Sequence, residues 1–189
     1  MRSITSSVFS LFILFSMPGA APAFGQESRI RLDGIDRLAA QATEAIDINV
    51  DGALLKLVAT VLPGTKVSSA AKIKELISGI DGIYIRRLEF DKEGGYRTED
   101  VEMIRAQVRP PAWTRVVGVR AGRGRNHVEA YVKSEGNNIT GVTIISAEPR
   151  ELVVANVTGI IDIDKLAELF REIDLPWLEW TEPRKREKE

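Results

Sequence analysis

Three side chains in the stretch DINVDG could bind calcium. Asp47, Asn49 and Asp51 stand at the first, third and fifth positions of a calcium loop of the EF-hand type, and Gly52 stands at the sixth. Such a loop also needs a bidentate glutamate at its twelfth position, where this chain has Val58. The ligand set is incomplete, so we expect no metal or other cofactor here. The alternation instead predicts a strand whose last residue, Asp51, caps a helix beginning near Gly52.

Histidine and cysteine chemistry is almost absent from the chain. His127 is the only histidine, and there is no cysteine. This composition excludes HExxH metal sites, thiolate zinc sites and Cys-His catalysis. A Ser-His-Asp triad would have to use His127, and the chain has no GxSxG motif. We interpret His127 as a solvated residue at the start of a strand, and no catalytic set is predicted.

The most basic short segment is RAGRGR, residues 120–125. Arg120, Arg123 and Arg125, together with two glycines, could surround an anion such as phosphate. No helix N-terminus follows, so the segment is neither a P-loop nor a dinucleotide-binding fingerprint. The alternative is a hairpin turn kept soluble by its charge.

Two tryptophans stand out in the polar C-terminal segment. Trp177 and Trp180 lie three residues apart in PWLEW. They could dock on a partner or at a membrane interface, or they could fold back onto their own domain. We predict that residues 175–189 form a flexible, charged C-terminal tail.

Residues 1–23 have the pattern of a secretory signal peptide. Arg2 precedes the apolar run VFSLFILFSM, and APA at 21–23 is a cleavage signal. The run is too short to span a bilayer, and no later apolar run is long enough to do so. We expect a periplasmic or secreted protein with no membrane span after cleavage and, lacking cysteine, no lipid anchor. With 26 Lys and Arg against 27 Asp and Glu, nothing indicates nucleic-acid binding.

Hydrophobic periodicity predicts one α+β domain over residues 27–174. Helices are predicted near 33–45, 52–62, 69–79 and 98–109, and from Asp162 onward. The predicted N-caps of the last three are Ser68 or Ser69, Thr98 and Asp162. Strands are predicted at 46–50, 83–90, 113–120, 127–133, 139–146 and 151–159. This order favours a single, mainly antiparallel sheet of five or six strands with helices packed on one face. The run ELVVANV is apolar at both parities, so we expect an interior strand covered on both sides.

Several blocks resemble the bacterial domain-of-unknown-function family 4252. They are GIYIRRLEFDKEGGY at 82–96, GVTIISAEPRELVVANVTGIIDIDKLAEL at 141–169, VDGALLKL at 50–57 and Pro-Ala-Trp at 111–113. The similarity runs over roughly residues 31–170. It implies an exported α+β domain with no assigned reaction, so it transfers no functional residue.

Export combined with the lack of a catalytic set favours a non-catalytic periplasmic domain that binds an envelope partner or ligand. One alternative is a hydrolase or lyase that uses only Asp, Glu, Ser and Arg. A deep pocket with two carboxylates of well-separated pKa would favour that enzyme. A third class is a structural or assembly protein acting through an open sheet edge. The oligomeric state is left open.

Overall fold

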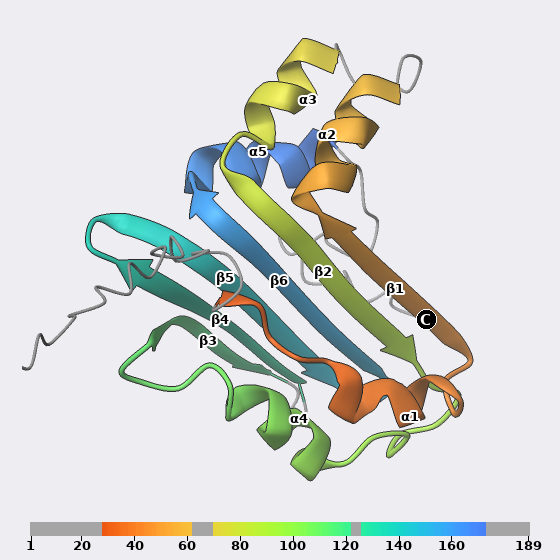
Figure 1. The fold of residues 1–189 in the computed structure, drawn as a ribbon. Coiled ribbons are helices and arrows are strands. Elements are labelled where there is room, and N and C mark those ends of the chain that lie inside the picture. Colours follow the sequence, from red (N-terminus) through yellow and green to blue (C-terminus); the bar gives the residue numbers. More distant parts are fainter. Residues whose placement is uncertain (1–27, 62–69, 122–125, 173–189) are drawn as a thin grey trace, which may run out of the picture.

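The protein is built on one antiparallel sheet (Figure 1). The computed structural model describes residues 28–61, 70–121 and 126–172. Within these residues six strands lie in the order β1-β2-β6-β5-β4-β3. The strands are β1 (Glu44–Asp51), β2 (Ile80–Glu89), β3 (Trp113–Ala121), β4 (Asn126–Glu135), β5 (Asn138–Glu148) and β6 (Glu151–Ile161). The helical segments are η2 (Asp33–Ile35), α1 (Asp36–Ala39), α2 (Gly52–Val61), α3 (Ala70–Leu76), α4 (Thr98–Arg105) and α5 (Ile163–Glu172).

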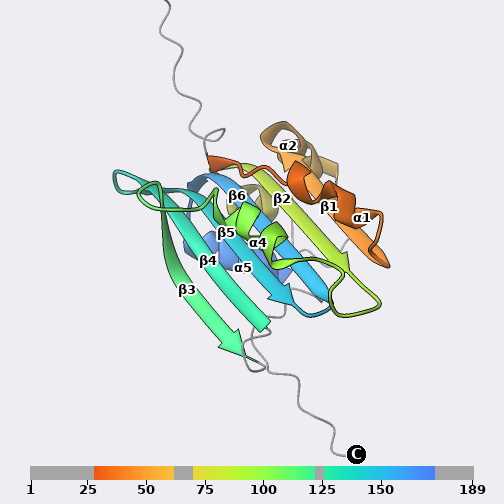
Figure 2. The ribbon, with the colours of Figure 1, turned by 90° about the horizontal axis from the view of Figure 1, so that it is seen from below.

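The α+β class and the single antiparallel sheet are confirmed, but the helices lie against both faces of the sheet rather than one. Leu88 and Leu152 pack with η2, α1 and α4 in one core cluster. Ile85 and Val157, at the opposite parity of the same strands, pack with α2, α3 and α5 in a second cluster. Figures 1 and 2 show the two groups of helices on opposite sides of the sheet. Successive side chains of a strand point to opposite faces, so each apolar parity required its own cover.

Strand β6 shows this double burial most clearly. Residues 152–159 are all buried, and only Glu151 and Ile160 near the strand ends are more accessible. The prediction that ELVVANV is an interior strand covered on both sides is therefore confirmed. The strand lies between β2 and β5, near the middle of the sheet.

The predicted helix at 33–45 is much shorter than expected. Helical backbone ends at Ala39, and β1 already begins at Glu44. The N–H of Thr43 donates to the carbonyl of Glu89, and β1 then pairs with β2 along its whole length. Pairing with β2 therefore places Glu44 and Ala45 in a strand, although they fall within the range for which the apolar spacing predicted a helix. Within β1 the predicted alternation is confirmed, since Ile46 and Ile48 are half-buried while Asp47 and Asn49 are exposed.

Two of the predicted helix caps are confirmed. Asp51 Oδ1 accepts from the N–H of Leu54 at 2.9 Å, and Asp162 Oδ1 accepts from Asp164 and Lys165. Thr98 was predicted to cap α4, but it is the first helical residue and Arg97 is the N-cap. The predicted cap of α3 at Ser68 or Ser69 lies outside the described residues.

A buried asparagine fastens the N-terminal segment to the sheet. The amide oxygen of Asn156 on β6 accepts from the N–H of Ile30 at 3.2 Å. Its Nδ2 lies 3.1 Å from the Ser28 carbonyl, 3.2 Å from the Val142 carbonyl and 3.1 Å from Thr143 Oγ1. Asn156 is fully buried, so these bonds replace water entirely. The segment that precedes α1 is therefore part of the fold.

Candidate functional site

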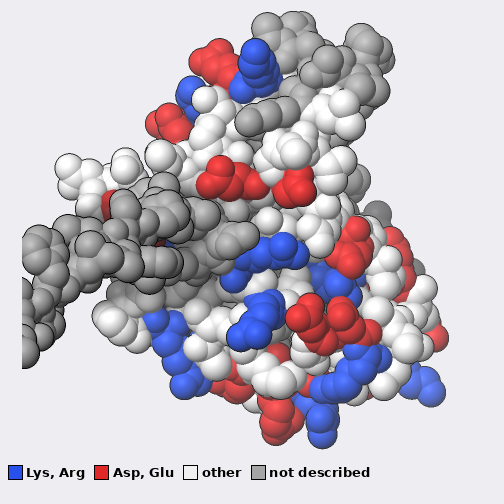
Figure 3. All heavy atoms as spheres, viewed as in Figure 1, with Lys and Arg blue, Asp and Glu red and all other residues white. Residues whose placement is uncertain are grey.

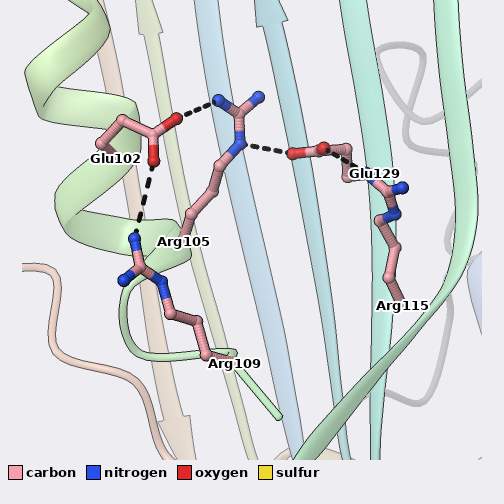
Figure 4. Close-up of polar contacts among 5 residues, drawn as sticks. All are labelled: Glu102, Arg105, Arg109, Arg115 and Glu129. Carbon is pink, nitrogen blue, oxygen red and sulfur yellow. Dashed lines mark hydrogen bonds and ion pairs between the residues drawn. The ribbon is translucent and has the colours of Figure 1, made fainter.

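Charged side chains from α4, the loop that follows it, β3 and β4 meet in one network (Figure 4). Arg105 lies between two carboxylates: its Nε is 2.5 Å from Glu129 Oε2 and its Nη1 is 2.7 Å from Glu102 Oε1. Arg115 Nη1 reaches the other oxygen of Glu129 at 3.3 Å, and Arg109 Nη2 lies 3.8 Å from Glu102. The side chain of Glu129 is only 9% exposed, so its charge depends on these partners.

The network keeps its central members ionised. Burial raises the pKa of Glu129, but the hydrogen bonds and charges of Arg105 and Arg115 outweigh burial, and the pKa is lowered overall. Burial lowers the pKa of Arg105, but its bonds to Glu102 and Glu129 outweigh that effect and raise it. Neither contact uses Nη2 of Arg105. The guanidinium is thus charged and held in one orientation.

Helix α4 is itself anchored by a buried carboxylate. Asp100 is fully buried, and its Oδ2 accepts from the backbone N–H of Arg97 at 2.8 Å. Its other oxygen, Oδ1, accepts from the guanidinium of Arg37 on α1. Val101 and Ile104 on the inner side of α4 join the core beneath. These contacts fix the first turn of α4, and with it the direction in which Arg105 leaves the helix.

A cavity of about 280 Å³ opens beside Arg105, between α4, the loop before it and the ends of β4 and β5. We call it the α4 cavity. It is lined by Glu93, Gly94, Tyr96, Thr98, Val101, Arg105, His127, Ala147 and Pro149. Val101 and Ala147 belong to the apolar core, so they form an apolar floor. Arg105, Thr98, Glu93 and His127 supply polar groups. This arrangement suits a ligand with a small apolar part and an anionic group.

The phenol of Tyr96 has a structural role at this cavity. Its hydroxyl donates to the carbonyl of Glu148, and its ring packs against Phe90 with centroids 5.8 Å apart. Burial, followed by the charge of Glu148, raises the pKa of Tyr96 to about 12. The hydroxyl therefore stays protonated near neutral pH and does not serve as a base there.

Arg120 comes closer to this cavity than its place in the sequence suggests. It is exposed on β3, directly opposite His127 of β4 in the strand register. Opposed residues of an antiparallel pair point to the same face, so Arg120 lies beside His127, which lines the cavity, although Arg120 itself is not part of the lining. Arg123 and Arg125 fall in residues 122–125, and Trp177 and Trp180 in residues 173–189, all outside the described part of the chain.

The sequence analysis did not identify Arg105 or Glu129 as site residues, and it did not predict that His127 lines a cavity. His127 is half-buried and lines the cavity, which a solvated strand end would not do. One signal was present: in HVEAY, the residues His127, Glu129 and Tyr131 alternate on one face of β4. Arg105 could not have been matched to them, because it arrives from a separate helix.

No cluster of three His, Asp or Glu side chains that could hold a metal ion occurs among the described residues. In DINVDG, Asp47 forms an ion pair with Arg86 at 2.8 Å, and Asp51 is engaged as the cap of α2. No helix of the described ranges is long and apolar enough to cross a bilayer.

The fold and site define a small α+β domain whose sheet carries helices on both faces and a polar cavity beside one helix. The model of the family described as domain of unknown function 4252 (DUF4252) matches residues 40–169, and the chain belongs to this family. The matched range includes α4, the residues that line the α4 cavity, and the strands β3 and β4. Neither the curated proteins nor the solved structures contain a match.

Proposed function

We propose that this chain is an exported, non-catalytic domain of the bacterial envelope that binds a partner or ligand through an anionic group. Export is supported by the signal-peptide pattern of residues 1–23. Binding is supported chiefly by one observation: the α4 cavity combines an apolar floor with Arg105, whose guanidinium two carboxylates hold in place. A pre-oriented donor loses little conformational entropy when a ligand arrives.

The bound group is a single carboxylate or phosphate rather than a polyanion. Arg105, Arg120 and His127 can each donate to an oxygen anion, and Thr98 adds a hydroxyl. The described part of the face in Figure 3 shows basic and acidic side chains next to each other, without an extended surface of one sign. Nucleic acid would require a continuous basic surface.

Two of the described carboxylates give no support to the enzyme alternative. The pKa values of Glu129 and Glu168 are both lowered. For Glu168 the hydrogen bond from Lys72 is the main cause. A glutamate acting as a general acid near neutral pH would need a raised pKa. These residues therefore give no support to a hydrolase or lyase.

The test uses His127 as a reporter. Since it is the only histidine of the chain, its imidazole ring protons give isolated NMR signals. The mature protein is titrated with sodium succinate, and separately with sodium phosphate, at constant ionic strength. We expect a saturable shift of the His127 signals, with affinity reduced about tenfold in Arg120→Gln, the loss of roughly one charge-assisted hydrogen bond.

Arg109→Gln is the matched control. It removes the same charge, but Arg109 is 64% exposed and does not line the cavity. Its affinity for both anions should equal that of the unchanged protein. Equal losses in the two variants would show only general charge attraction, and the absence of any saturable shift would reject the proposal. Turnover in an activity screen would favour the enzyme.

A second candidate function, assembly through the sheet edge, is favoured by β3. This strand pairs only with β4 among the described strands, and eight of its nine residues are exposed. An exposed edge offers unpaired backbone groups to another strand. Light scattering over a range of concentrations distinguishes this role, since assembly through the edge would raise the mass with concentration.

A further inference from the structure

The two edge strands of the described sheet carry opposite charges. Strands β1 and β3 each have one neighbour among the described strands, and Figure 1 shows them at the two edges of the sheet. Every residue of β1 is exposed or half-buried, and eight of the nine residues of β3 are exposed. Strand β1 contains three acidic residues and no basic one, whereas β3 contains Arg115 and Arg120 and no acidic one. The two edges are therefore complementary in charge.

Rows of opposed residues connect one edge to the other and show which side chains share a face. One row runs from Asp47 on β1 through β2, β6, β5 and β4 to Gly118 on β3. The next row runs in the same way from Ile48 to Val117. Side chains alternate between the faces along a strand, so Asp47 and Arg120 lie on the face that carries α1 and α4.

The other face of each edge strand is apolar. On β3, Val117 and Val119 are 44% and 51% exposed. On β1, the residues between the polar ones are half-buried: Ile46, Ile48 and Val50. Both sets lie on the face that carries α2, α3 and α5. A second copy that continued the sheet would therefore place apolar beside apolar side chains on this face, and acidic beside basic side chains on the other.

The directions of the strands permit this continuation. All neighbouring strands are antiparallel and the described sheet has six of them, so β1 and β3 run in opposite directions. A second copy in the same orientation brings its β1 antiparallel to β3 of the first copy, with the matching faces of the two sheets aligned. Pairing of two identical edges would instead bring two basic strands or two acidic strands together, which opposed like charges disfavour.

The backbone groups of the two edges also match. A bond from the N–H of Phe90 to the turn before β6 fixes which residues of β2 bond to β6, because bonding alternates along an antiparallel pair. Carried from strand to strand, this alternation leaves the N–H and C=O groups of two residues on each edge pointing outward: Asp47 and Asn49 on β1, and Gly118 and Arg120 on β3. Both pairs of residues belong to the face of α1 and α4, so they can bond to each other with the faces aligned.

We propose that copies of this chain assemble head to tail through their sheets, with β3 of one copy pairing antiparallel with β1 of the next. The register that matches charge, apolar side chains and backbone groups places Arg120 opposite Asp47 of the second copy. In the same register Val119 lies opposite Ile48. The irregularity of β3 confines regular pairing to the part of the strand from Val117 onward. Since every copy offers both edges, the assembly does not stop at a dimer.

This inference rests on the second candidate function, assembly through the sheet edge, and adds that the partner is a second copy and that its contact is β1. The experiment uses one proline variant for each edge. Gly118→Pro and Asn49→Pro remove outward N–H groups that oppose each other in the proposed register, and the bonds to β4 and β2 use other residues. A Cβ at Gly118 has its nearest neighbour, Cζ of Arg115, at 3.6 Å, which is ordinary contact.

The mass of the mature chain is measured by sedimentation velocity and light scattering from about 10 μM to about 1 mM. For the unchanged protein we expect a mean mass that rises with concentration beyond that of a dimer. Each proline variant should stay monomeric, with an unchanged circular dichroism spectrum. An equimolar mixture of the two should form a dimer and nothing larger, because the intact β3 of Asn49→Pro can pair only with the intact β1 of Gly118→Pro.

Two further variants support the comparison. Asn49→Ala is the matched control, because it removes the same side chain and keeps the N–H, so it should assemble like the unchanged protein. Val119→Lys provides a second way to block β3 at an exposed position without proline. It should be monomeric alone and should form a dimer with Asn49→Pro.

Three results would overturn the proposal. A constant monomer mass of the unchanged protein would reject it together with assembly through the edge. A mass that levels off at a dimer, is lost in Gly118→Pro and persists in Asn49→Pro would show that β3 pairs with itself; edge assembly would then stand and the head-to-tail contact would fail. Folded variants whose mixtures remain monomeric would reject the pairing of β3 with β1.

Discussion

Replacing Asn156 with alanine tests the tertiary contact that holds the N-terminal segment on the sheet. The Asn156 amide accepts from Ile30 N–H and has three acceptors around Nδ2, among them the carbonyl of Ser28. Since Nδ2 carries two hydrogens, it can donate one full hydrogen bond to each of only two of those three acceptors at a time. Alanine supplies none of these bonds, and the site admits no water in exchange because Asn156 is 0% exposed.

The expected cost follows from the groups left behind. Ile30 N–H and the Ser28 carbonyl each lose their partner in a buried place, at roughly 1–3 kcal/mol apiece. The space left by the amide adds a smaller cavity cost. We therefore expect Asn156→Ala to lower the free energy of unfolding by about 3–5 kcal/mol, a large part of the roughly 5–15 kcal/mol typical of a domain.

Urea denaturation followed by circular dichroism measures this loss, and hydrogen exchange at the Ile30 amide locates it. Asn49→Ala is the control, because Asn49 is exposed on the edge strand β1. That variant should change stability by at most about 0.5 kcal/mol. A loss below about 1 kcal/mol in Asn156→Ala, with the Ile30 amide still protected, would refute the reasoning that this amide fastens residues 28–30.

Two further predictions concern the ion network and a helix cap. Glu129→Gln should lower stability by about 1–3 kcal/mol at pH 7. Because the folded pKa of Glu129 is lowered, its contribution is complete above the unfolded value of about 4.3 and is lost as pH falls through the folded pKa. Urea denaturation from pH 7 to pH 3 should show the difference from the unchanged protein shrinking below about pH 4; a difference constant over that range would contradict the ion-pair explanation. Asp51→Ala should cost about 1 kcal/mol in thermal or urea denaturation through the lost cap of α2. Asp47→Ala on the same strand removes only an exposed ion pair, so a larger loss there would contradict the assignment of the cap.

Local patterns predicted most elements of this fold. Strand β6 was recognisable because both of its parities are apolar, and the exposed acidic side of β1 followed from simple alternation. The caps at Asp51 and Asp162 depended on residues within three positions of the helix start. These features rest on short-range geometry, which neighbouring residues determine together.

The candidate site was less accessible to such reasoning. Arg120 was singled out for its charge, whereas its position opposite His127 depends on the register of β3 and β4. Arg105 meets Glu129 only because α4 crosses the sheet, 24 residues away along the chain. The hydrophobic periodicity of α4 and of β4 does not predict that these two side chains form an ion pair.

Local sequence patterns were sufficient to predict the α+β class, the antiparallel sheet and the interior position of β6. They also predicted that DINVDG is a strand leading into a capped helix, because alternation and capping are local properties. Only tertiary contacts established that helices lie on both faces, that the chain from Glu44 onward pairs in the sheet instead of continuing a helix, and that Arg105, His127 and Arg120 approach one another. Each of these depends on which distant segments pair and pack, and their energies arise only when those segments meet.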